Sequence, residues 1–490
     1  MTKSKQDPIT FETLPQLLEN DTKVKVAGID VDGILRGKLI SKEKFLSVAE
    51  NGFGFCSVIF GWDMHDQVYS SVSKISVNDD GISDILVYPD LKSFRRIPWE
   101  NNVPFFIVSF FDPVQKIPFY ACPRGLLKVA AKKLNTNGFK ALAGVEYEFA
   151  NFRVPQVDHG TFETNHTHAS VAKFLQFNTA ASLPPLTEGK FGYSMTRSVQ
   201  NSDYFYEIFN TCEKFNCSIE GWHSESGPGI FEAALTYDEA LELADKASLF
   251  KYVVKSIATN YGVTPCFMAK PQYGLPGNSG HMHVSLVDKN GRNIFAREEI
   301  DKNAKYEDIA NLSDLGRYFL AGLLDGLPDI MPMFAPTINS YKRLDENYWA
   351  PATVSWGLEH RLASIRVITP PISKSEATRF EVRVPGADSN PYFVLATIIS
   401  LGWRGIEKKL ENLPPPLAKG DKADKDSYKP TRLARTLREA NNLFMKNGSV
   451  AREVFGDQFV QHFGGTREHE IQLWEQAVTD WEIQRYIETV

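Results

Sequence analysis

Cysteine is scarce in this sequence, and its spacing excludes the protein classes that depend on it. The 490 residues contain only five cysteines, which are scattered and form no Cys-x-x-Cys pair. Such a set predicts neither a disulfide framework nor a zinc knuckle, and it is typical of a reducing compartment. Long apolar runs are also lacking, because the longest, near 105–111 and 392–403, are too short to cross a bilayer. Residues 1–14 are polar and contain no apolar signal core, so we expect a cytoplasmic protein without a membrane partner.

An excess of positive charge is missing as well. The formal net charge is -6, and the sequence contains no basic arm and no RNA-binding motif, so we expect no nucleic-acid partner. A hydrophobic content of 43% and an aromatic content of 12% are sufficient for substantial cores. The length therefore allows one large domain with a smaller one beside it.

The pattern of strands and helices divides the chain in two. Residues 23–40 predict a hairpin, and the apolar runs that follow predict a small β-rich domain over residues 1–115. After Pro123, which suits the first turn of a helix, helices alternate with charged strands. We therefore expect an α+β protein whose larger domain covers residues 116–490. The expected helices lie at about 10–20, 124–137, 199–217, 237–260, 311–326, 389–412 and 430–447. Two polar stretches, 159–168 and 419–426, predict surface loops.

The segment Gly144-Val145-Glu146-Tyr147-Glu148-Phe149 places two carboxylates on one side of a predicted strand. Side chains two residues apart in a strand share a face, so Glu146 and Glu148 point the same way. Two such anions repel each other and lose hydration, which is costly unless cations lie opposite. Taken alone, the segment is equally consistent with a strand face in contact with water.

Two further segments offer ligands for a cation. Glu225 and Glu232 bracket a Gly-Pro-Gly turn, so a hairpin can bring their carboxylates together, although the turn alone fits an ordinary surface hairpin equally well. Further on, a Gly/Asn/Ser loop leads into a strand on which His281 and His283 face one way. The usual alternative is a core histidine bonded to a carbonyl. A glycine loop followed at once by two imidazoles favours a ligand site instead.

Arginines alternate with apolar residues in the same part of the chain. In the segment 379–385, Arg379, Glu381 and Arg383 share one side, and the segments 339–343 and 361–366 add more cations. Arginine suits bidentate contact with carboxylates and phosphates. Several charged strand faces together predict an interior that holds divalent metals, a polyphosphate and a carboxylate substrate. With five glutamates and one histidine as possible ligands, the set favours Mg²⁺ or Mn²⁺ over zinc.

Taken in order, these segments resemble the glutamine synthetase superfamily, class I type. The shared motifs, which span nearly the whole chain, are GVEYEF, HSESGPGIFE, GNSGHMHVS, NSYKRL, RLASIR and RFEVR. The resemblance implies an N-terminal β-grasp domain and a catalytic domain with a curved antiparallel sheet and surrounding helices. It implies ATP and two or more Mg²⁺ or Mn²⁺ ions as cofactors. It also implies a homo-oligomer of two stacked rings, usually a dodecamer, with active sites between subunits.

The same resemblance assigns roles to individual residues. The ligands of one metal are matched by Glu148, Glu225 and Glu232. Those of the second metal are matched by Glu146, His281 and Glu381. The clamp on the substrate glutamate resembles Arg343, Arg383 and the backbone of Gly280. The cations around the transferred phosphoryl group resemble Arg361 and Arg366, and the nucleotide side is matched by Glu220, Ser285 and Arg379.

The departures from the family pattern fall mainly on the amine side of the site. Family members that use ammonium carry, before an Ala-Pro pair, a loop glutamate that helps to deprotonate it. Here Trp349 stands at that position, and an indole cannot accept a proton. Ile230 replaces a polar residue, and Asp63 is the candidate for the ammonium-site aspartate. The segment 411–414 lacks the tyrosine that is adenylylated in many bacterial members, so we expect no such regulation.

Three functions fit this sequence. We expect an ATP-dependent ligase that activates the γ-carboxylate of glutamate as an acyl phosphate and transfers it to an amine other than ammonia, as γ-glutamylpolyamine members do. Trp349 could then cover an alkyl or aryl amine or contact its cation, unless it packs on a neighbouring subunit. The alternative is a genuine glutamine synthetase in which Glu346 or another loop carboxylate acts as the base. The third is a catalytically inactive structural homologue, against which the retained carboxylates argue because unused buried charges destabilise a fold.

Overall fold

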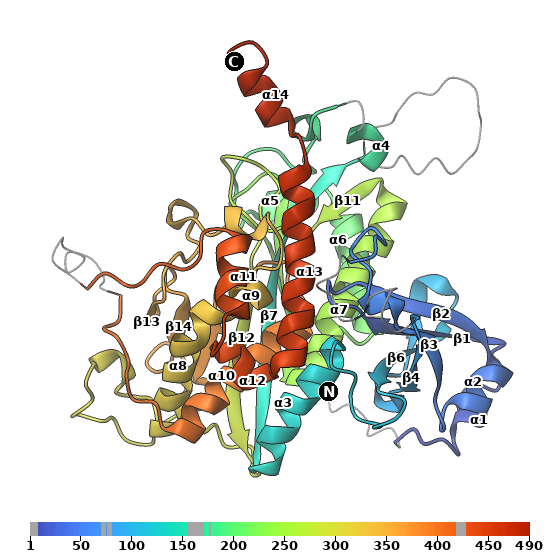
Figure 1. Ribbon diagram of the computed structural model, residues 1–490, viewed down its shortest axis with the longest axis horizontal. Coiled ribbons are helices and arrows are strands. Elements are labelled where there is room, and N and C mark those ends of the chain that lie inside the picture. Colours follow the sequence, from blue (N-terminus) through green and yellow to red (C-terminus); the bar gives the residue numbers. More distant parts are fainter. Residues whose placement is uncertain (1–7, 70–74, 76–80, 155–170, 176–177, 418–427) are drawn as a thin grey trace.

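The structure is a computed structural model that describes residues 8–69, 75, 81–154, 171–175, 178–417 and 428–490. It contains two β-sheets with helices around them, and the smaller sheet lies to one side of the larger (Figure 1). The two predicted surface loops, 159–168 and 419–426, lie outside the described residues. Within the described ranges, no helix combines the length and the apolar composition that a membrane span requires.

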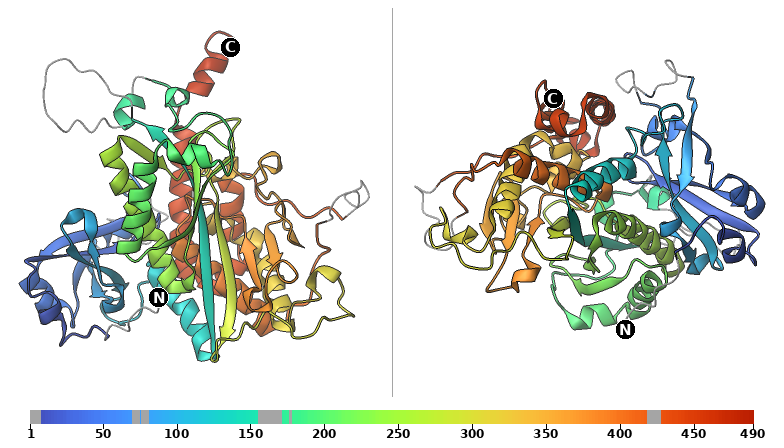
Figure 2. Two further views of the ribbon diagram at one scale, coloured as in Figure 1. Left: turned by 180° about the vertical axis from the view of Figure 1, so that it is seen from behind. Right: turned by 90° about the horizontal axis from the view of Figure 1, so that it is seen from below.

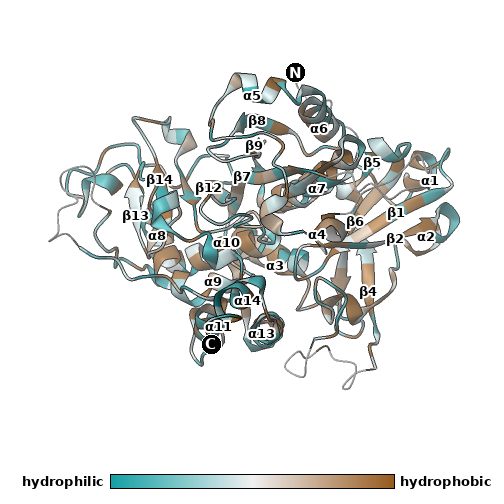
Figure 3. Ribbon diagram, turned by 90° about the horizontal axis from the view of Figure 1, so that it is seen from above, coloured by the Kyte–Doolittle hydropathy of each residue, from teal (hydrophilic) through white to brown (hydrophobic). Residues whose placement is uncertain are grey.

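The smaller sheet is built from the N-terminal part of the chain. Its six strands include the predicted hairpin, and the order is β2-β1-β6-β4-β3 with β5 paired to β6. The strands are β1 (Lys23–Ile29), β2 (Leu35–Ser41), β3 (Phe53–Cys56), β4 (Asp84–Pro89), β5 (Arg95–Ile97) and β6 (Val103–Phe111). Strands β1 and β6 run parallel, the other pairs are antiparallel, and helix α2 (Lys42–Val48) packs against β1 and β2. Hydrophobic residues lie along β4 (Figure 3). One parallel pair among antiparallel pairs makes this a mixed sheet, which fits the expected β-grasp type.

The larger sheet has nine strands and is centred on β7. Its order is β13-β14-β15-β12-β7-β9-β8, and β10 and β11 also pair with β7. The strands are β7 (Phe139–Arg153), β8 (Ile219–Ser224), β9 (Ile230–Leu235), β10 (Asp238–Glu239), β11 (Val263–Cys266), β12 (Gly280–Asp288), β13 (Trp356–Leu358), β14 (Ile365–Ile368) and β15 (Arg379–Val382). Seen from behind, β7 and β12, the two longest strands of this sheet, run side by side (Figure 2).

Helices cover one face of this sheet and fill the space beside it. Helices α3 and α7 pack on β7, and α10 packs on α3, α7 and α8. The principal helices are α3 (Pro123–Thr136), α6 (Ser202–Lys214), α7 (Ala240–Ala258), α8 (Asp314–Gly326), α10 (Pro391–Lys408), α11 (Leu437–Met445), α12 (Val450–Phe455), α13 (Asp457–Gln476) and α14 (Asp480–Tyr486). Shorter helices are α1 (Leu14–Leu17), α4 (Val171–Leu175), α5 (Met195–Val199) and α9 (Met331–Phe334).

The helix expected over residues 10–20 is much shorter than predicted. Only Leu14–Leu17 is helical, because Pro15 is tolerated only in the first turn and a turn from Leu18 to Asp21 leads directly into β1. Five of the other expected helices are present with ends that differ by a few residues. The helix expected at 430–447 covers only Leu437–Met445, because the Thr436 side chain caps its first turn. The predicted domain boundary near 115 falls between the end of β6 and the start of α3, and the division itself stays a prediction.

Candidate functional site

Strand β7 presents two glutamates on one face and apolar side chains on the other. Val145, Tyr147 and Phe149 are buried, and the Tyr147 ring stacks on Phe250 of α7 at 6.2 Å between ring centroids. Glu146 and Glu148 alternate with these residues and are half-buried on the opposite face. The period of two in the sequence therefore fixes which side of the sheet carries charge.

The pairing register brings more donors to that face. Across the β7–β12 pair, His281 lies opposite Glu146, and across the β7–β9 pair, Glu232 lies opposite Glu148. Across the β12–β15 pair, Glu381 lies opposite His283. Directly opposed residues on one face have Cβ atoms about 5 Å apart, so ordinary antiparallel pairing is enough to assemble the site.

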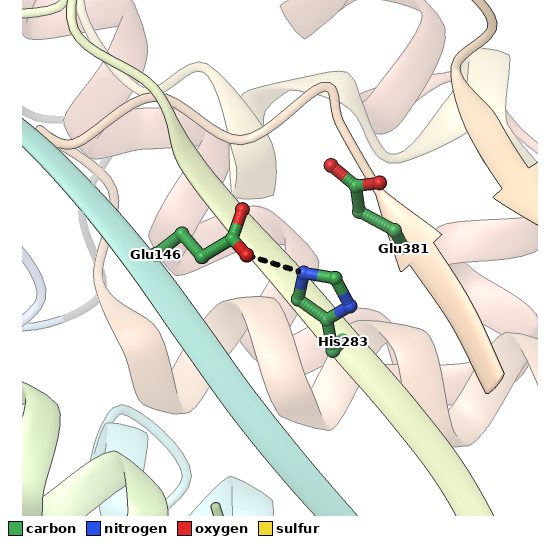
Figure 4. Close-up of side chains that lie close together, drawn as sticks. All are labelled: Glu146, His283 and Glu381. Atoms are coloured by element: carbon green, nitrogen blue, oxygen red, sulfur yellow. Dashed lines mark ion pairs between the residues drawn. The ribbon is translucent and has the colours of Figure 1, made fainter. Parts of the chain in front are cut away.

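Three groups of donor atoms result, each with its ligand atoms within 4.8 Å of one another. They are Glu146, His283 and Glu381; Glu146, Glu232 and His281; and His223, Glu225 and Glu232. Figure 4 shows the first group, in which side chains from β7, β12 and β15 converge and His283 Nε2 lies 3.3 Å from Glu146 Oε1. Carboxylate oxygens with a minority of imidazole nitrogens form a donor set that fits Mg²⁺ or Mn²⁺.

The pKa shifts of these residues are of two kinds: the pKa values of Glu148 and Glu232 are raised, and those of Glu381 and His281 are lowered. Burial, with the charges of Glu232 and Glu225, raises the pKa of Glu148 to about 7. Burial also raises the pKa of Glu232, against a hydrogen bond from His223. Both shifts mean that these carboxylates lack enough positive charge nearby, which a divalent cation would supply.

Around Glu381 and His281, the positive charge is supplied by Arg383. Burial opposes ionisation of Glu381, yet the charges of His281 and Arg383 lower its pKa to about 2. Burial, and then the charge of Arg383, lowers the pKa of His281 to about 4. His281 is therefore neutral near pH 7, with a lone pair free for a metal, and Arg383 is the counter-charge of Glu381.

Five of the six predicted ligands fall within these three groups, but in a grouping that differs from the predicted one. Glu225 and Glu232 share a group with His223, and Glu146 and Glu232 each belong to two groups. Glu148 belongs to none of the three; its Oε2 accepts a hydrogen bond from Ser279 N at 2.5 Å. The assignment of six ligands to two metals stays a prediction.

His223 is a donor that sequence reasoning missed. Its Nε2 lies 3.0 Å from Glu232 Oε1, its Nδ1 lies 3.6 Å from Glu225 Oε1, and its ring stacks on Tyr193. The signal was present, since His223 and Glu225 are two residues apart at the end of a strand, like Glu146 and Glu148.

Two of the predicted arginines, Arg343 and Arg383, lie together at the end of β15. Arg343 is buried, and its guanidinium donates to the carbonyls of Arg383, Val384 and Pro385 at 2.9 to 3.2 Å. Burial lowers its pKa to about 10, which leaves it charged near neutral pH. The Arg383 Nη1 donates to Glu381, whereas Arg383 Nε is buried without a partner among the described residues. Such an orphaned donor is suited to an anionic ligand.

Two more arginines were expected near the phosphate. Arg366 donates to both Glu359 and Glu381, whereas Arg361 is exposed on the loop between β13 and β14. Gly280 is the first residue of β12, and a Cβ atom there would meet the carbonyl oxygen of Gly386 at 2.7 Å. The close backbone approach explains why this position is glycine.

A cavity of about 510 Å³ adjoins the donor groups. Its lining includes Glu146 and His283 together with the three predicted nucleotide-side residues, Glu220, Ser285 and Arg379. Arg379 Nε also donates to His283 Nδ1 at 3.2 Å. The structure therefore brings the three residues to one cavity, and their role in nucleotide binding stays a prediction.

The amine-side residues lie in three different settings. Trp349 has a φ of 59° and is 66% exposed, directly after the short 3₁₀ turn Glu346–Tyr348. Ile230 is buried in a small apolar cluster with Ala150, Phe152 and Leu183, so the departure at this position serves packing. The carboxylate of Asp63 accepts from the backbone of His65 and Gln67 and lies 3.2 Å from His469 on α13. Its contact with an amine stays a prediction.

Solved structures share this two-sheet architecture. A structure titled GmaS/ADP complex aligns with a TM-score of 0.76 over 97% of this chain and 99% of that chain, at 24% identity. A structure of a glutamine synthase homolog gives a TM-score of 0.73 over 95% and 97%, at 20% identity. The fold is thus an α+β fold of the glutamine synthetase type. The family model described as glutamine synthetase, catalytic domain, matches residues 120–486, and the protein belongs to this family.

Sequence relatives carry two kinds of name. Type-1 glutamine synthetase 2 of Dictyostelium discoideum is 41% identical over 471 residues, which are 95% of this chain and 84% of the relative. Glutamate–isopropylamine ligase of a Pseudomonas species is 33% identical over 96% of each chain. Gamma-glutamylethanolamide synthetase GlnA4 of Streptomyces coelicolor is 32% identical over 98% of this chain and 96% of the relative.

Proposed function

We propose that this protein is an ATP-dependent ligase that joins the γ-carboxylate of glutamate to an amine other than ammonia. The observation that carries the proposal is the meeting, on one sheet face, of donor groups for divalent cations with arginines and a cavity. Relatives named for isopropylamine and for ethanolamide support the choice of amine.

The donor groups fit two or more Mg²⁺ or Mn²⁺ ions. We assign Glu148, Glu225 and Glu232 to one ion and Glu146, His281 and Glu381 to a second, with His223 beside the first. Bound there, the ions would shield the negative charge of the ATP phosphates and of the substrate carboxylate. The raised pKa of Glu148, caused by burial and by neighbouring carboxylates, supports this assignment because it marks a need for positive charge.

The arginines are assigned to the two anionic substrates. Arg343 and Arg383, with the backbone of Gly280, would orient glutamate, and the orphaned Nε of Arg383 supports this role. Arg361 and Arg366 would lie at the phosphoryl group, and Glu220, Ser285 and Arg379 at the nucleotide. Preorganised cations stabilise charge that develops in a transition state more effectively than mobile water does.

The reaction has two steps. An oxygen of the γ-carboxylate attacks the γ-phosphorus of ATP, the bond to ADP breaks, and a glutamyl acyl phosphate forms. The amine nitrogen then attacks the acyl carbon, phosphate leaves with the electron pair of its C–O bond, and the nitrogen loses a proton. Because both steps create charge on phosphoryl oxygens, the side chains of this sheet face act on the same atoms throughout.

The amine side is where Trp349 matters. An exposed indole can cover an alkyl chain or contact its ammonium group, but it cannot take a proton. Alternatively, the protein is a glutamine synthetase, which is favoured by the 41% identity to the Dictyostelium relative. In that case Glu346 is the candidate base, although its carboxylate lies 3.8 Å from Arg432 in the present conformation.

An assay of phosphate release separates the two. Purified protein with ATP, Mg²⁺ and glutamate is given ammonium or one member of a panel of mono-, di- and polyamines. We expect turnover with at least one amine to exceed that with ammonium by tenfold or more in kcat/KM, about 1.4 kcal/mol of discrimination. Robust turnover with ammonium alone would refute the amine proposal. We also expect a homo-oligomer of two stacked rings, which analytical ultracentrifugation tests.

A further inference from the structure

Glu359 occupies a backbone conformation that a glutamate rarely adopts. It follows β13 directly and has a φ of 49°, in the left-handed region. Its amide donates to the carbonyl of Val367 on β14 at 2.9 Å, so the neighbouring strand holds this conformation in place. A side chain kept in a disfavoured backbone region is a reason to look for a task at that position.

The carboxylate of Glu359 is directed at one partner. Its Oε2 accepts from Arg366 Nε at 3.0 Å and from Arg366 Nη2. Its Oε1 is buried and has no partner among the described residues. Among the described residues, Arg366 is therefore the only hydrogen-bond partner of the Glu359 carboxylate, which accepts from no backbone amide.

Arg366 lies between two carboxylates. Its Nη1 donates to Glu381 Oε2 at 3.0 Å, whereas its Nε and Nη2 donate to Glu359. The side chains of Arg366 and Glu359 are 13% and 18% exposed, so water screens the pair only weakly. Burial opposes the charge of Arg366, but its bonds to Glu359 and its attraction to Glu381 raise the pKa of the guanidinium.

The bonds to Glu359 and Glu381 fix the plane of the Arg366 guanidinium but do not use all of its donors. Arginine has five N–H donors, and three are used here, which leaves two for another acceptor. Arg366 would otherwise turn toward Glu381 alone, as a flexible side chain does when one of its partners is lost. Preorganised donors lose less entropy on binding an anion than mobile ones.

We propose that Glu359 is a positioning residue that holds the guanidinium of Arg366 in the orientation that receives a phosphate group. The inference rests on the proposed function, which assigns Arg366 to the phosphoryl group. It adds a residue that acts through Arg366 without touching substrate. It also explains why a glutamate occupies a left-handed backbone conformation at position 359.

Two substitutions test the proposal, and both keep Arg366. Glu359→Gln removes the charge but keeps the shape, and Glu359→Gly removes the side chain and relieves the backbone, because glycine adopts positive φ freely. We expect each variant to bind Mg-AMP-PNP, a non-hydrolysable ATP analogue that keeps a γ-phosphate, about 10-fold to 100-fold more weakly by calorimetry, the range for losing a charge-assisted pair. The KM for the amine should change less than about twofold, since a positioning effect on the phosphate side does not alter amine binding.

Stability and coupling distinguish positioning from a structural role. In Glu359→Gly, relief of the left-handed backbone should offset part of the stability lost with the ion pair, and its melting temperature shows whether weaker nucleotide binding reflects unfolding. In an Arg366→Gln background, Glu359→Gln should have no further effect beyond about twofold, because the two residues act as one unit. Glu239→Gln is the matched control, since Glu239 pairs with exposed Lys140 at 2.9 Å and lies outside the donor groups. Additive losses, or Mg-AMP-PNP binding by Glu359→Gln equal to that of the wild type, would overturn the proposal.

The calorimetry is independent of turnover. Wild-type protein that binds Mg-AMP-PNP but shows no ATP turnover with any of the amines or with ammonium would refute the proposed function and leave the positioning role to be decided by the variants. Active wild type with unaffected variants would refute the positioning role alone. Wild type that binds no Mg-AMP-PNP would refute both.

Discussion

Replacing Glu148 by glutamine should stabilise the metal-free protein at alkaline pH. The Glu148 carboxyl is buried, and burial with the charges of Glu232 and Glu225 raises its pKa from 4.5 to about 7. A carboxyl whose pKa is higher in the folded state holds its proton more tightly there. Its contribution to stability is therefore complete below about pH 4.5 and is lost as the pH rises through about 7. Glutamine, which has the same shape and no charge, avoids this loss.

The magnitude follows from the two pKa values. At about 1.4 kcal/mol for each pH unit between them, the loss reaches about 3 kcal/mol for the wild type at pH 8. Glutamine can keep the hydrogen bond from Ser279 N, because its amide oxygen also accepts. The Glu148→Gln variant should therefore melt several degrees above the wild type at pH 8 in the presence of a chelator. The two proteins should converge as the pH falls toward 4.5.

Divalent cations should reverse this difference. We expect saturating Mg²⁺ to bind the carboxylates of the folded protein and to raise the melting temperature of the wild type, whereas the variant has lost one negative charge and should gain less. Differential scanning calorimetry with chelator and with Mg²⁺, at pH 5 and pH 8, measures all four conditions. Glu239→Gln serves again as the control for removing a surface charge. If metal-free wild type and Glu148→Gln melt together at pH 8, the electrostatic reasoning is wrong.

Four further substitutions give measurable outcomes. Arg343→Lys should raise the KM for glutamate about 100-fold in initial-rate assays, because lysine cannot reproduce a guanidinium held by three carbonyls. Trp349→Glu should raise kcat/KM for ammonium at least about 10-fold relative to other amines, with little change in melting temperature because the indole is 66% exposed. Gly280→Ala should lower the free energy of unfolding by about 1 to 3 kcal/mol, measured with denaturant, since its Cβ would meet the oxygen of Gly386 at 2.7 Å. His223→Ala should reduce the rise in melting temperature that Mg²⁺ produces in a titration, because one donor of its group is lost.

The charged face could be predicted from the sequence because strand periodicity is a local property. Glu146 and Glu148 share a face for the same reason that Val145 and Tyr147 share the other. The turn between Glu225 and Glu232 could also be predicted, since Gly-Pro-Gly favours a reversal of the chain direction and leaves few other conformations. Each of these inferences needs only residues that are close in the chain.

What could not be predicted depends on pairing between distant strands. The sequence does not state that β7 lies between β9 and β12, and this arrangement makes Glu146 and Glu232 common to two donor groups. Glu359 gave no signal either, because its left-handed conformation is imposed by a hydrogen bond to Val367 on a neighbouring strand. Ile230 could be recognised as a departure, but its apolar cluster forms only in the folded chain.

The apolar face of β7 explains how the fold can sustain carboxylates that repel one another. Tyr147 and Phe149 pack with Phe250 and Phe267 in a buried ring cluster behind the strand. Each large apolar side chain contributes about 1.5 to 3 kcal/mol when it is buried, so this packing exceeds the cost of one unfavourable carboxylate in front. The strand therefore cannot bend away to relieve the repulsion, and an opposing cation would relieve it instead. A protein that used this face only for assembly would gain stability by losing its glutamates, so their retention favours a ligase over an inactive homologue.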